Sequence, residues 1–441
     1  MDTYIKDYGA FPDDTKVQTA AIQKAIDECA ASGGGTVYFE PGIYRSGTIY
    51  LRSDTYLNLP PKCILKGSDN LDDYNEPYAW QQNAPIPAER ANGKHLVVAL
   101  EIENSGIRGG GIIDGNGKHF GFRNEDGFSR PSQMVYLCES KNIRIRDVEL
   151  LNSTYWTCFV HGCEDVIITG VRIKNNPDIQ NSDGIDIDTS RRVIVSDCLI
   201  DSQDDCITFR CDNQLFSKLK DKTRILEDIT VTNCQLRTHS CNAIRIGVGN
   251  GTIKNCLVSN IIVRDSAKGV CIESSYVFND AEKPGTTIEN VSFNNVYMEA
   301  RCPIFMSSQC NGLTDMPAPD IRNIRFSNMT VQAEHNIVVQ ANEGCIVENI
   351  SFNNIDMTLK GMPRCIDKYG YSEWDYKTSP AAFYIANAEN VALNNVQVHI
   401  EEEDSPIIKG VIAQNTAVNL QNFVVKKNRK SVEACEVRCV D

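Results

Sequence analysis

The sequence predicts an all-β fold, a single-stranded right-handed parallel β-helix in which successive coils of the chain stack on one another. The first observation is a repeat. From about residue 104 onward, segments such as KNIRIRDVELLNS and ENISFNNIDMTLK share the pattern N-[IV]-x-[IVF]-x-[ND]-[IVM]-x-[VIML]. The second observation is that each segment contains short strands of alternating apolar residues, separated by a polar corner. One such unit cannot bury its apolar face alone, so the units must stack.

We expect one domain over residues 1–441, with an N-terminal cap at about 1–53, coils with inserted loops at about 54–430, and a C-terminal cap in the remainder. Residues 15–32 have apolar side chains at helical spacing and are followed by Gly33, which predicts a short capping helix. A terminal helix suits a solenoid because the open end of the first coil must be covered.

Asparagine recurs at the polar corners of the repeat. This residue tolerates the left-handed backbone conformation, and its side chain can bond to neighbouring backbone or to an equivalent asparagine one coil away. We therefore expect corner positions or side-chain ladders at Asn233, Asn255, Asn294, Asn328, Asn353 and Asn394.

Several segments depart from the repeat and are predicted to be loops, and long loops on a rigid scaffold usually shape a site. They lie at 69–98, 117–133, 211–226, 276–286, 308–320 and 362–380. Their aromatic side chains could stack on sugar rings or anchor the loops, and they include Trp80, Tyr276, Tyr369, Tyr371, Trp374 and Tyr376.

Composition restricts the partners. The formal net charge of -14 argues against nucleic acid and anionic membrane surfaces. The first residues show no basic region followed by an apolar run, and no apolar stretch is long enough to span a bilayer. Of the 18 cysteines, six lie in or beside repeating apolar strand patterns: Cys138, Cys163, Cys198, Cys234, Cys256 and Cys345. We therefore expect reduced core thiols and a cytoplasmic protein. No CxxC zinc spacing is present, and we expect neither a metal nor a cofactor.

Three carboxylates organise the chain. Asp183 lies in NSDG, and the pair Asp204–Asp205 lies in QDDC, with two alternating runs between them. If the chain completes one coil over this interval, Asp183 and the pair stack on one face. Clustered acids are what cleavage of a glycosidic bond needs, one to protonate the leaving oxygen and one to activate water. The alternative is that these acids are corner residues that bind backbone amides.

The chain resembles glycoside hydrolase family 28, the polygalacturonases and their relatives, over nearly its whole length. The resemblance rests on DYGAFPDDT, GGGTVYFEPGIY, GGGIIDGNG, RPSQMVYLCESKNIRIRDVELLNSTYWT, NSDGID and QDDC, taken together and in order. It implies that Asp204 is the general acid, that Asp183 and Asp205 hold the attacking water, and that hydrolysis inverts the anomeric configuration. Crowding of like charges would raise the pKa of at least one member and keep it protonated.

Two elements of the family do not match. Asn242, in SCNAIRIG, stands where the family has a histidine; it can hydrogen-bond a sugar or orient Asp205 but cannot titrate. His239 could reach the site from its loop or be a surface histidine. In GVCIESS, Cys271 and Glu273 replace the arginine and lysine that bind the galacturonate carboxylate, and a carboxylate there would repel a uronate.

A cation could still come from nearby. Arg245 in IRIG, or Lys268 directly before GVCIESS, could provide it, although Arg245 could equally pair with Glu273 and neutralise it. The remaining candidates each have a structural alternative. Trp156 either packs beneath the site or is a core residue, and Asn181 either fixes the Asp183 loop or touches substrate. Arg210 either binds substrate or forms a salt bridge.

The sequence thus predicts an inverting glycoside hydrolase acting on pectic or related oligosaccharides, with a subsite that departs from ordinary galacturonan. Long loops and a cytoplasmic location favour exo action on short imported oligosaccharides. Two alternatives stay open: a non-catalytic carbohydrate-binding β-helix, and a uronate lyase or epimerase on the same fold. Neither the sugar nor the oligomeric state follows from the sequence.

Overall fold

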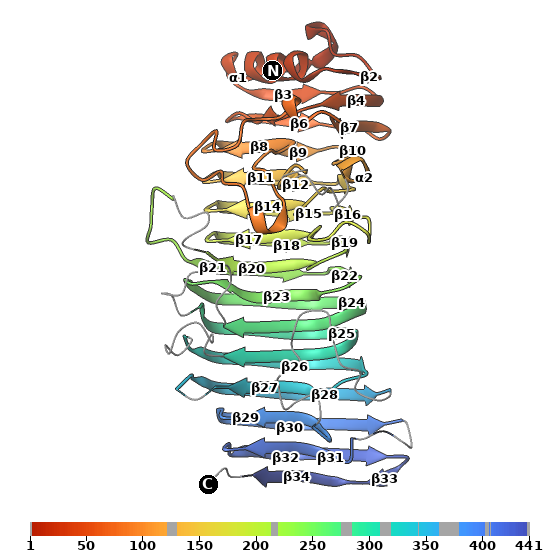
Figure 1. The fold of residues 1–441 in the computed structure, drawn as a ribbon, viewed down its shortest axis with the longest axis vertical. Helices are drawn as coiled ribbons and strands as arrows, with labels where there is room; N and C mark the ends of the chain where they lie inside the picture. The colour runs from red at the N-terminus through yellow and green to blue at the C-terminus, as the bar shows by residue number, and fades with distance from the viewer. Residues whose placement is uncertain are drawn as a thin grey trace. The chain divides into compact units, whose positions relative to one another are not determined.

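The computed structural model describes residues 2–120, 130–212, 219–274, 285–308, 319–342, 344–360, 379–401, 405 and 407–438. Parallel strands dominate this part of the chain and pair with the strands of the preceding and following coils, as Figure 1 shows. Two compact units are distinguished: unit 1 comprises 1–207 with 212–234, and unit 2 comprises 208–211 with 235–441. The expectation of one domain stays a prediction.

The strands of unit 1 form three parallel sheets, because most coils contribute one strand to each sheet. The first sheet is β5–β8–β11–β14–β17, the second is β1–β3–β6–β9–β12–β15–β18–β21, and the third is β2–β4–β7–β10–β13–β16–β19. The strands of the first sheet are β5 (Ile49–Tyr50), β8 (Val97–Leu100), β11 (Val135–Cys138), β14 (Cys158–His161) and β17 (Ile185–Asp188).

The other two sheets of unit 1 begin earlier in the chain than the first sheet. The second contains β1 (Asp2–Tyr4), β3 (Gly35–Tyr38), β6 (Thr55–Asn58), β9 (Glu103–Arg108), β12 (Lys141–Arg146), β15 (Glu164–Thr169), β18 (Arg191–Ser196) and β21 (Leu226–Thr232). The third contains β2 (Asp13–Val17), β4 (Gly42–Ser46), β7 (Cys63–Gly67), β10 (Ile112–Asp114), β13 (Glu149–Leu151), β16 (Arg172–Lys174) and β19 (Leu199–Ser202). Single helical turns occur at η1 (Ile5–Tyr8), η2 (Leu71–Asp73), η3 (Pro87–Glu89) and α2 (Gly117–Phe120).

The predicted capping helix is present as α1 (Thr19–Ala31), which lies across the first coils in Figure 1. It buries Ile22, Ala25, Ile26 and Cys29, the apolar residues on which the prediction rested. Its predicted start at residue 15 is wrong. Asp13–Val17 pairs with β4 instead, so tertiary hydrogen bonding overrides the local helical spacing there.

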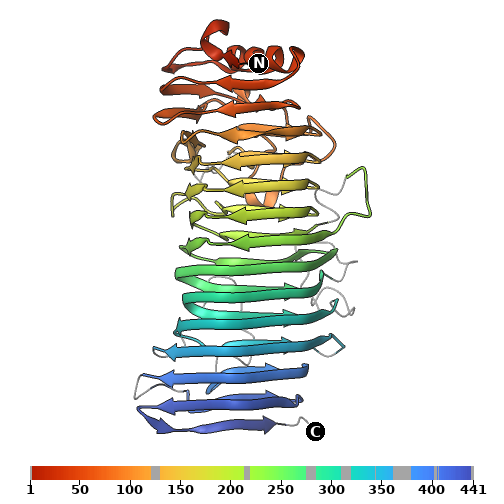
Figure 2. The same cartoon turned by 180° about the vertical axis from the view of Figure 1, so that it is seen from behind.

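Unit 2 has longer strands, several of which bend through a corner without a break. One run of pairings is β22–β24–β25–β26–β28–β30–β32, and another is β23–β24–β25–β27–β29–β31–β34. Seen from behind, these strands lie side by side in Figure 2. The bounds are β22 (Gln235–Thr238), β23 (Asn242–Gly249), β24 (Thr252–Ser274), β25 (Thr287–Ser308), β26 (Ile321–Ala333), β27 (Ile337–Ala341), β28 (Val347–Leu359), β29 (Ala381–Ala386), β30 (Glu389–Ile400), β31 (Lys409–Gln414), β32 (Val418–Lys427), β33 (Lys430–Ser431) and β34 (Glu433–Arg438). The remaining strand, β20, spans Ile207–Cys211.

Stacked side chains stabilise unit 2 at its corners and in its core. Asn255, Asn290, Asn323, Asn349 and Asn390 form a chain in which each side-chain amide donates to the carbonyl oxygen of the asparagine one coil back, over 2.7 to 3.2 Å. The φ angles of these five asparagines lie between 50° and 59°, in the left-handed region. The expected asparagine ladder is confirmed, with parallel links from Asn328 to Asn294 and from Asn394 to Asn353.

We expect Phe326→Ala to destabilise unit 2 strongly. Phe326 is fully buried and stacks between Phe293 and Phe352, with ring centroids 4.9 and 5.0 Å apart. Removing a buried phenylalanine side chain typically costs about 3 to 5 kcal/mol because a cavity remains. Thermal unfolding followed by circular dichroism measures the effect. Leu257→Ala, on an exposed position of β24, is the control; equal melting temperatures for the two variants would contradict this packing.

Candidate active site

The three organising carboxylates meet within unit 1. Asp183 precedes β17, and the pair Asp204–Asp205 follows β19 one coil later. Gly184 N donates to Asp205 O at 2.8 Å, and Ile185 N donates to Cys206 O at 2.9 Å. The backbone after Asp183 therefore lies directly against the backbone after Asp204, as the one-coil interpretation predicts. All three side chains are buried, with exposed fractions of 6 to 8%.

The position of Asp183 raises its proton affinity. Burial and the neighbouring charges of Asp204, Asp186 and Asp205 raise the pKa of the Asp183 carboxyl well above its usual range. Its Oδ1 is buried and has no hydrogen-bond partner among the described residues. The expected effect of crowding is therefore present at Asp183, one of the two residues that the family resemblance assigns to holding the attacking water.

The local sequence explains why acids crowd here. In β17, IDID, the isoleucines point into the coil and Asp186 and Asp188 point outward, yet both aspartates are fully buried. Asp188 is held by His161 of β14, whose Nδ1 lies 2.7 Å from its Oδ2, and by the backbone N–H of Asp212 at 2.9 Å. His161, one coil before Asp183, thus links the end of β14 to the end of β17 through the Asp188 side chain.

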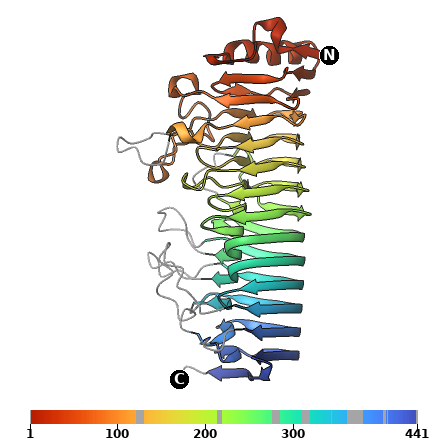
Figure 3. The ribbon, with the colours of Figure 1, turned by 90° about the vertical axis from the view of Figure 1, so that its right-hand side faces the viewer.

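The insertion, residues 69–98, covers the outward face of the first sheet at β11 and β14. Trp80 lies 5.7 Å from Tyr136 between ring centroids, and the Tyr136 hydroxyl donates to Gln82 O at 3.0 Å. Part of this segment, in orange, stands out from the coils in Figure 3. We call the buried apolar group beneath it the insertion cluster: Ile86, Ala91, Tyr136, Cys138, Tyr155, Trp156 and Phe159.

Trp156 belongs to this insertion cluster. It is 3% exposed and stacks on Tyr155 at 4.8 Å between ring centroids. Of the two roles that the sequence left open for Trp156, packing in the core is the one that its burial supports. Trp80, predicted as a loop aromatic for sugar stacking or anchoring, anchors the insertion.

A buried arginine that sequence reasoning missed lies next to Asp183. Arg130 lies in the predicted loop 117–133, shortly before β11, and is fully buried. Its Nη2 donates to Asn181 Oδ1 at 3.2 Å, and its Nη1 donates to Gln180 O at 2.5 Å. Asn181 has φ of 55°, so the turn before Asp183 is in the left-handed region and is held by this arginine. The predicted role of Asn181 in fixing the Asp183 loop agrees with these contacts.

Unit 2 contains the positions where the sequence departs from the family. Arg245 of β23 pairs with Glu273 of β24, with Nη2 3.2 Å from Oε2, and the Glu273 side chain is only 4% exposed. This is the neutralising pair that the sequence analysis offered as one alternative. Cys271 lies opposite Arg245 in the register of these strands.

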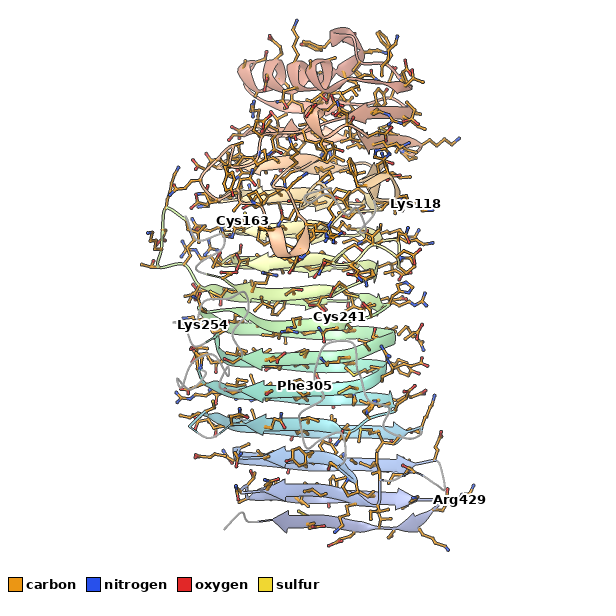
Figure 4. The ribbon with its side chains drawn as sticks, in the orientation of Figure 1. Lys118, Cys163, Cys241, Lys254, Phe305 and Arg429 are labelled. Atoms are coloured by element: carbon orange, nitrogen blue, oxygen red, sulfur yellow. The ribbon has the colours of Figure 1, made fainter. Side chains whose placement is uncertain are left out.

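The other predicted residues of unit 2 differ in exposure. Asn242 is buried and donates from Nδ2 to Cys241 Sγ at 3.1 Å, and Lys268, opposite it in register, is also buried. Lys268 Nζ lies 5.2 Å from the ring centroid of Phe305, which is labelled in Figure 4. Arg210 is buried in β20, and His239 is exposed between β22 and β23. Whether these residues bind substrate stays a prediction.

Several predicted loop residues lie outside the described part of the chain. They are Tyr276, Tyr369, Tyr371, Trp374 and Tyr376. The cysteines that the structure describes are free thiols, most of them buried, as the strand patterns predict.

Comparison with known proteins places this arrangement among carbohydrate-active enzymes. Residues 81–365 match the family profile described as glycosyl hydrolases family 28, and residues 3–59 match rhamnogalacturonase A/epimerase, pectate lyase-like. An exo-poly-alpha-D-galacturonosidase from Dickeya chrysanthemi is 25% identical over 77% of this chain, which spans 62% of that relative's length. An endo-polygalacturonase from Pectobacterium carotovorum is 23% identical over 78% of this chain and 85% of its own.

Among solved structures, a family 28 exopolygalacturonase from Yersinia enterocolitica aligns with a TM-score of 0.70. The alignment covers 99% of this chain and 78% of that one, at 19% sequence identity. This likeness confirms the predicted single-stranded right-handed parallel β-helix.

We expect Asp183→Asn to stabilise the protein at neutral pH. In the unfolded chain Asp183 has its ordinary pKa of 3.8, whereas in the folded protein its pKa is raised and the carboxyl stays protonated to higher pH. Folding stability therefore falls as the pH rises above the unfolded pKa, and the loss is complete above the folded pKa. The variant escapes this loss. At pH 7 we expect its melting temperature to exceed that of wild type by about 2 °C, with no difference near about pH 3.

Asp178→Asn provides the matched control, because Asp178 lies exposed in the loop that precedes Asp183. Melting temperatures from differential scanning fluorimetry between pH 3 and 8 give the comparison. A wild-type advantage at pH 7, or a difference that does not change with pH, would contradict the buried and crowded state of Asp183.

Proposed function

Because the chain belongs to family 28 of the glycosyl hydrolases, we propose that it hydrolyses glycosidic bonds in pectic or related oligosaccharides with inversion of configuration. The observation that supports this most directly is the meeting of Asp183 with Asp204–Asp205 on adjacent coils of unit 1. A buried group of three acids is costly in a purely structural role, because each charge disfavours ionisation of the others.

The proposed chemistry divides the three carboxyls into two roles. Asp204 protonates the glycosidic oxygen of the leaving sugar, while Asp183 and Asp205 hold a water molecule and one of them takes its proton. Inversion requires this water to attack from the face opposite the leaving group. The raised pKa of Asp183 supports the retention of a proton within the cluster, as an acid step needs, and such a proton belongs to the interacting group rather than to one residue.

The substrate departs from ordinary galacturonan in this proposal. A uronate carboxylate is best bound by free cationic side chains. The family resemblance places the carboxylate-binding position in this segment, and in unit 2 the Arg245 guanidinium forms a neutral ion pair with Glu273. A neutral sugar, or a uronate that presents its carboxylate elsewhere, fits that pair better than a galacturonate carboxylate placed on Glu273.

Exo action is supported by the insertion. The outward face of β11 and β14 is occupied by the insertion cluster, and η3 and the Ile86–Ala91 bridge lie at the end of this cover nearest Arg130. A long polysaccharide therefore cannot continue from Asp183 across the outward face of β14 and β11. The bond that reaches the acids is accordingly close to one end of the substrate chain.

The remaining expectations about cellular context are part of the same proposal. Free thiols at the described cysteines favour a reducing compartment, in keeping with the expected cytoplasmic location. Within the described residues, no helix has the length and apolarity needed to cross a bilayer. The expected absence of nucleic-acid, membrane, metal and cofactor partners stays a prediction.

We expect wild-type protein to release a sugar of inverted anomeric configuration from at least one member of a panel of pectic and neutral oligosaccharides. Proton NMR of the fresh product, recorded before mutarotation, measures the configuration. Asp204→Asn should lower kcat by about 10³-fold or more, since the acid that assists the leaving group is lost.

Retention of configuration would contradict the assignment of the carboxylates. Activity lost in Asp204→Asn with sugar binding unchanged would exclude a non-catalytic binding protein. If the wild type hydrolyses no member of the panel but binds a sugar measurably, the result would favour a non-catalytic binding protein instead. An unsaturated product that absorbs in the ultraviolet would indicate a lyase.

Exo action has its own test in the product pattern. With a substrate oligosaccharide labelled at its reducing end, we expect one short product from the first minutes and a label that moves stepwise through shorter fragments. Chromatography of timed samples measures both. A spread of intermediate lengths at the earliest time points would show internal cleavage and would contradict the proposed block by the insertion.

A further inference from the structure

Arg130 is bound by oxygen atoms from three separate segments of unit 1. Its Nη1 donates to Thr154 O at 3.0 Å and to Gln180 O at 2.5 Å. Its Nη2 donates to Glu89 O at 2.6 Å and to Asn181 Oδ1 at 3.2 Å. Glu89 lies in η3 (Pro87–Glu89), which we call the tip of the insertion. Thr154 follows β13, and Gln180 and Asn181 form the turn before Asp183.

Further contacts link Arg130 to two of these segments, and link those two to each other. The Arg130 guanidinium lies over the ring of Tyr155, with Cζ 4.9 Å from the ring centroid. The hydroxyl of Tyr155 donates to the Glu89 carboxylate, and Ala91 forms a parallel bridge with Arg130. The tip of the insertion is thus joined to the turn that carries Asn181 through one arginine and one tyrosine.

The electrostatics favour a charged guanidinium at this site despite its burial. Burial lowers the pKa of Arg130 to about 10, while electrostatic interactions with Tyr155, Glu89 and Asp183 act in the opposite direction. The side chain therefore stays protonated at neutral pH. A buried cation of this kind is costly unless its donors are satisfied, and the planar guanidinium satisfies four oxygens at once. A lysine ammonium lacks the fork needed to reach all of them.

We propose that Arg130 is a positioning residue that holds the Asp183 carboxyl in place and ties the tip of the insertion to the same turn. The effect on catalysis rests on the proposed function, because it requires that Asp183 take part in the reaction. The geometry itself does not depend on that assignment. A shift of Asp183 by about 1 Å would cost about 100-fold in rate, since the water it holds would leave the attack line.

The test compares Arg130→Lys with Arg108→Lys. Arg108 is a matched control in unit 1, because it also lies over a tyrosine, Tyr56, at 5.6 Å and donates to Thr36 Oγ1 at 3.2 Å. It is partly buried and touches none of the three segments. Hydrogen exchange of the peptide covering residues 178–184, read by mass spectrometry, reports the turn directly. Steady-state kinetics on whichever oligosaccharide the wild type cleaves report catalysis.

In Arg130→Lys we expect amide exchange in 178–184 to become at least about 10-fold faster, with the rest of unit 1 unchanged. We expect kcat to fall about 100-fold while KM changes less than about threefold. Arg108→Lys should leave both readouts at wild-type values. Tyr155→Phe, which keeps the ring and removes only the hydroxyl on Glu89, should give a smaller effect of the same kind and serves if Arg130→Lys does not fold.

Unchanged exchange in 178–184 would overturn the proposal, whatever happens to activity. Exchange that rises equally throughout unit 1, or equally in Arg108→Lys, would also overturn it, because the role would then be general stabilisation. Absence of glycosidase activity in the wild type contradicts the proposed function alone, and the exchange result still decides the positioning role.

Discussion

Lateral hydrogen bonding between parallel coils is the constraint on which the rest of this structure depends. Each strand pairs with its counterpart one coil away in register, so side chains at equivalent positions must lie against one another. In unit 2 this requirement suits the residues present. Asparagine amides donate from coil to coil along an exposed corner, and Phe293, Phe326 and Phe352 stack in the core. Backbone pairing between coils thus restricts each corner and face to side chains that can lie against their own equivalents one coil away.

The same constraint is unfavourable where acids are stacked. Asp183 has Asp204, Asp205 and Asp186 as charged neighbours, and burial removes the water that would screen them. Amides at these positions would keep the hydrogen-bonding capacity without the repulsion, as they do in the asparagine ladder. The energetic disadvantage of three buried carboxyls points to chemistry rather than scaffolding. Arg130, which binds the turn before Asp183, contributes an opposite charge nearby.

The features that follow from the repeat could be predicted from the sequence. Features that depend on contacts between segments outside the repeat could not. The repeat spacing placed Asp183 beside Asp204–Asp205, and the corner pattern identified the asparagine ladder. Arg130 left no such signal, because its partners lie 24 to 51 positions away in segments outside the repeat. The start of α1 was missed for a related reason, since Asp13–Val17 prefers pairing with β4 over its local helical spacing. Similarly, the raised pKa of Asp183 depends first on its burial, and burial cannot be read from the sequence NSDG.

The separation of paired positions along the chain has a consequence for how the protein is made. Asn349 bonds to an asparagine 26 residues back, and Asn390 to one 41 residues back. Each coil of unit 2 therefore finds its pairing partner as soon as a few dozen further residues have left the ribosome. Growth of such a solenoid proceeds by addition of a strand to an existing edge, so early coils can serve as templates for later ones during synthesis. A pause in translation within a coil would leave an unpaired edge exposed, the point at which chains of this architecture are most open to association with one another.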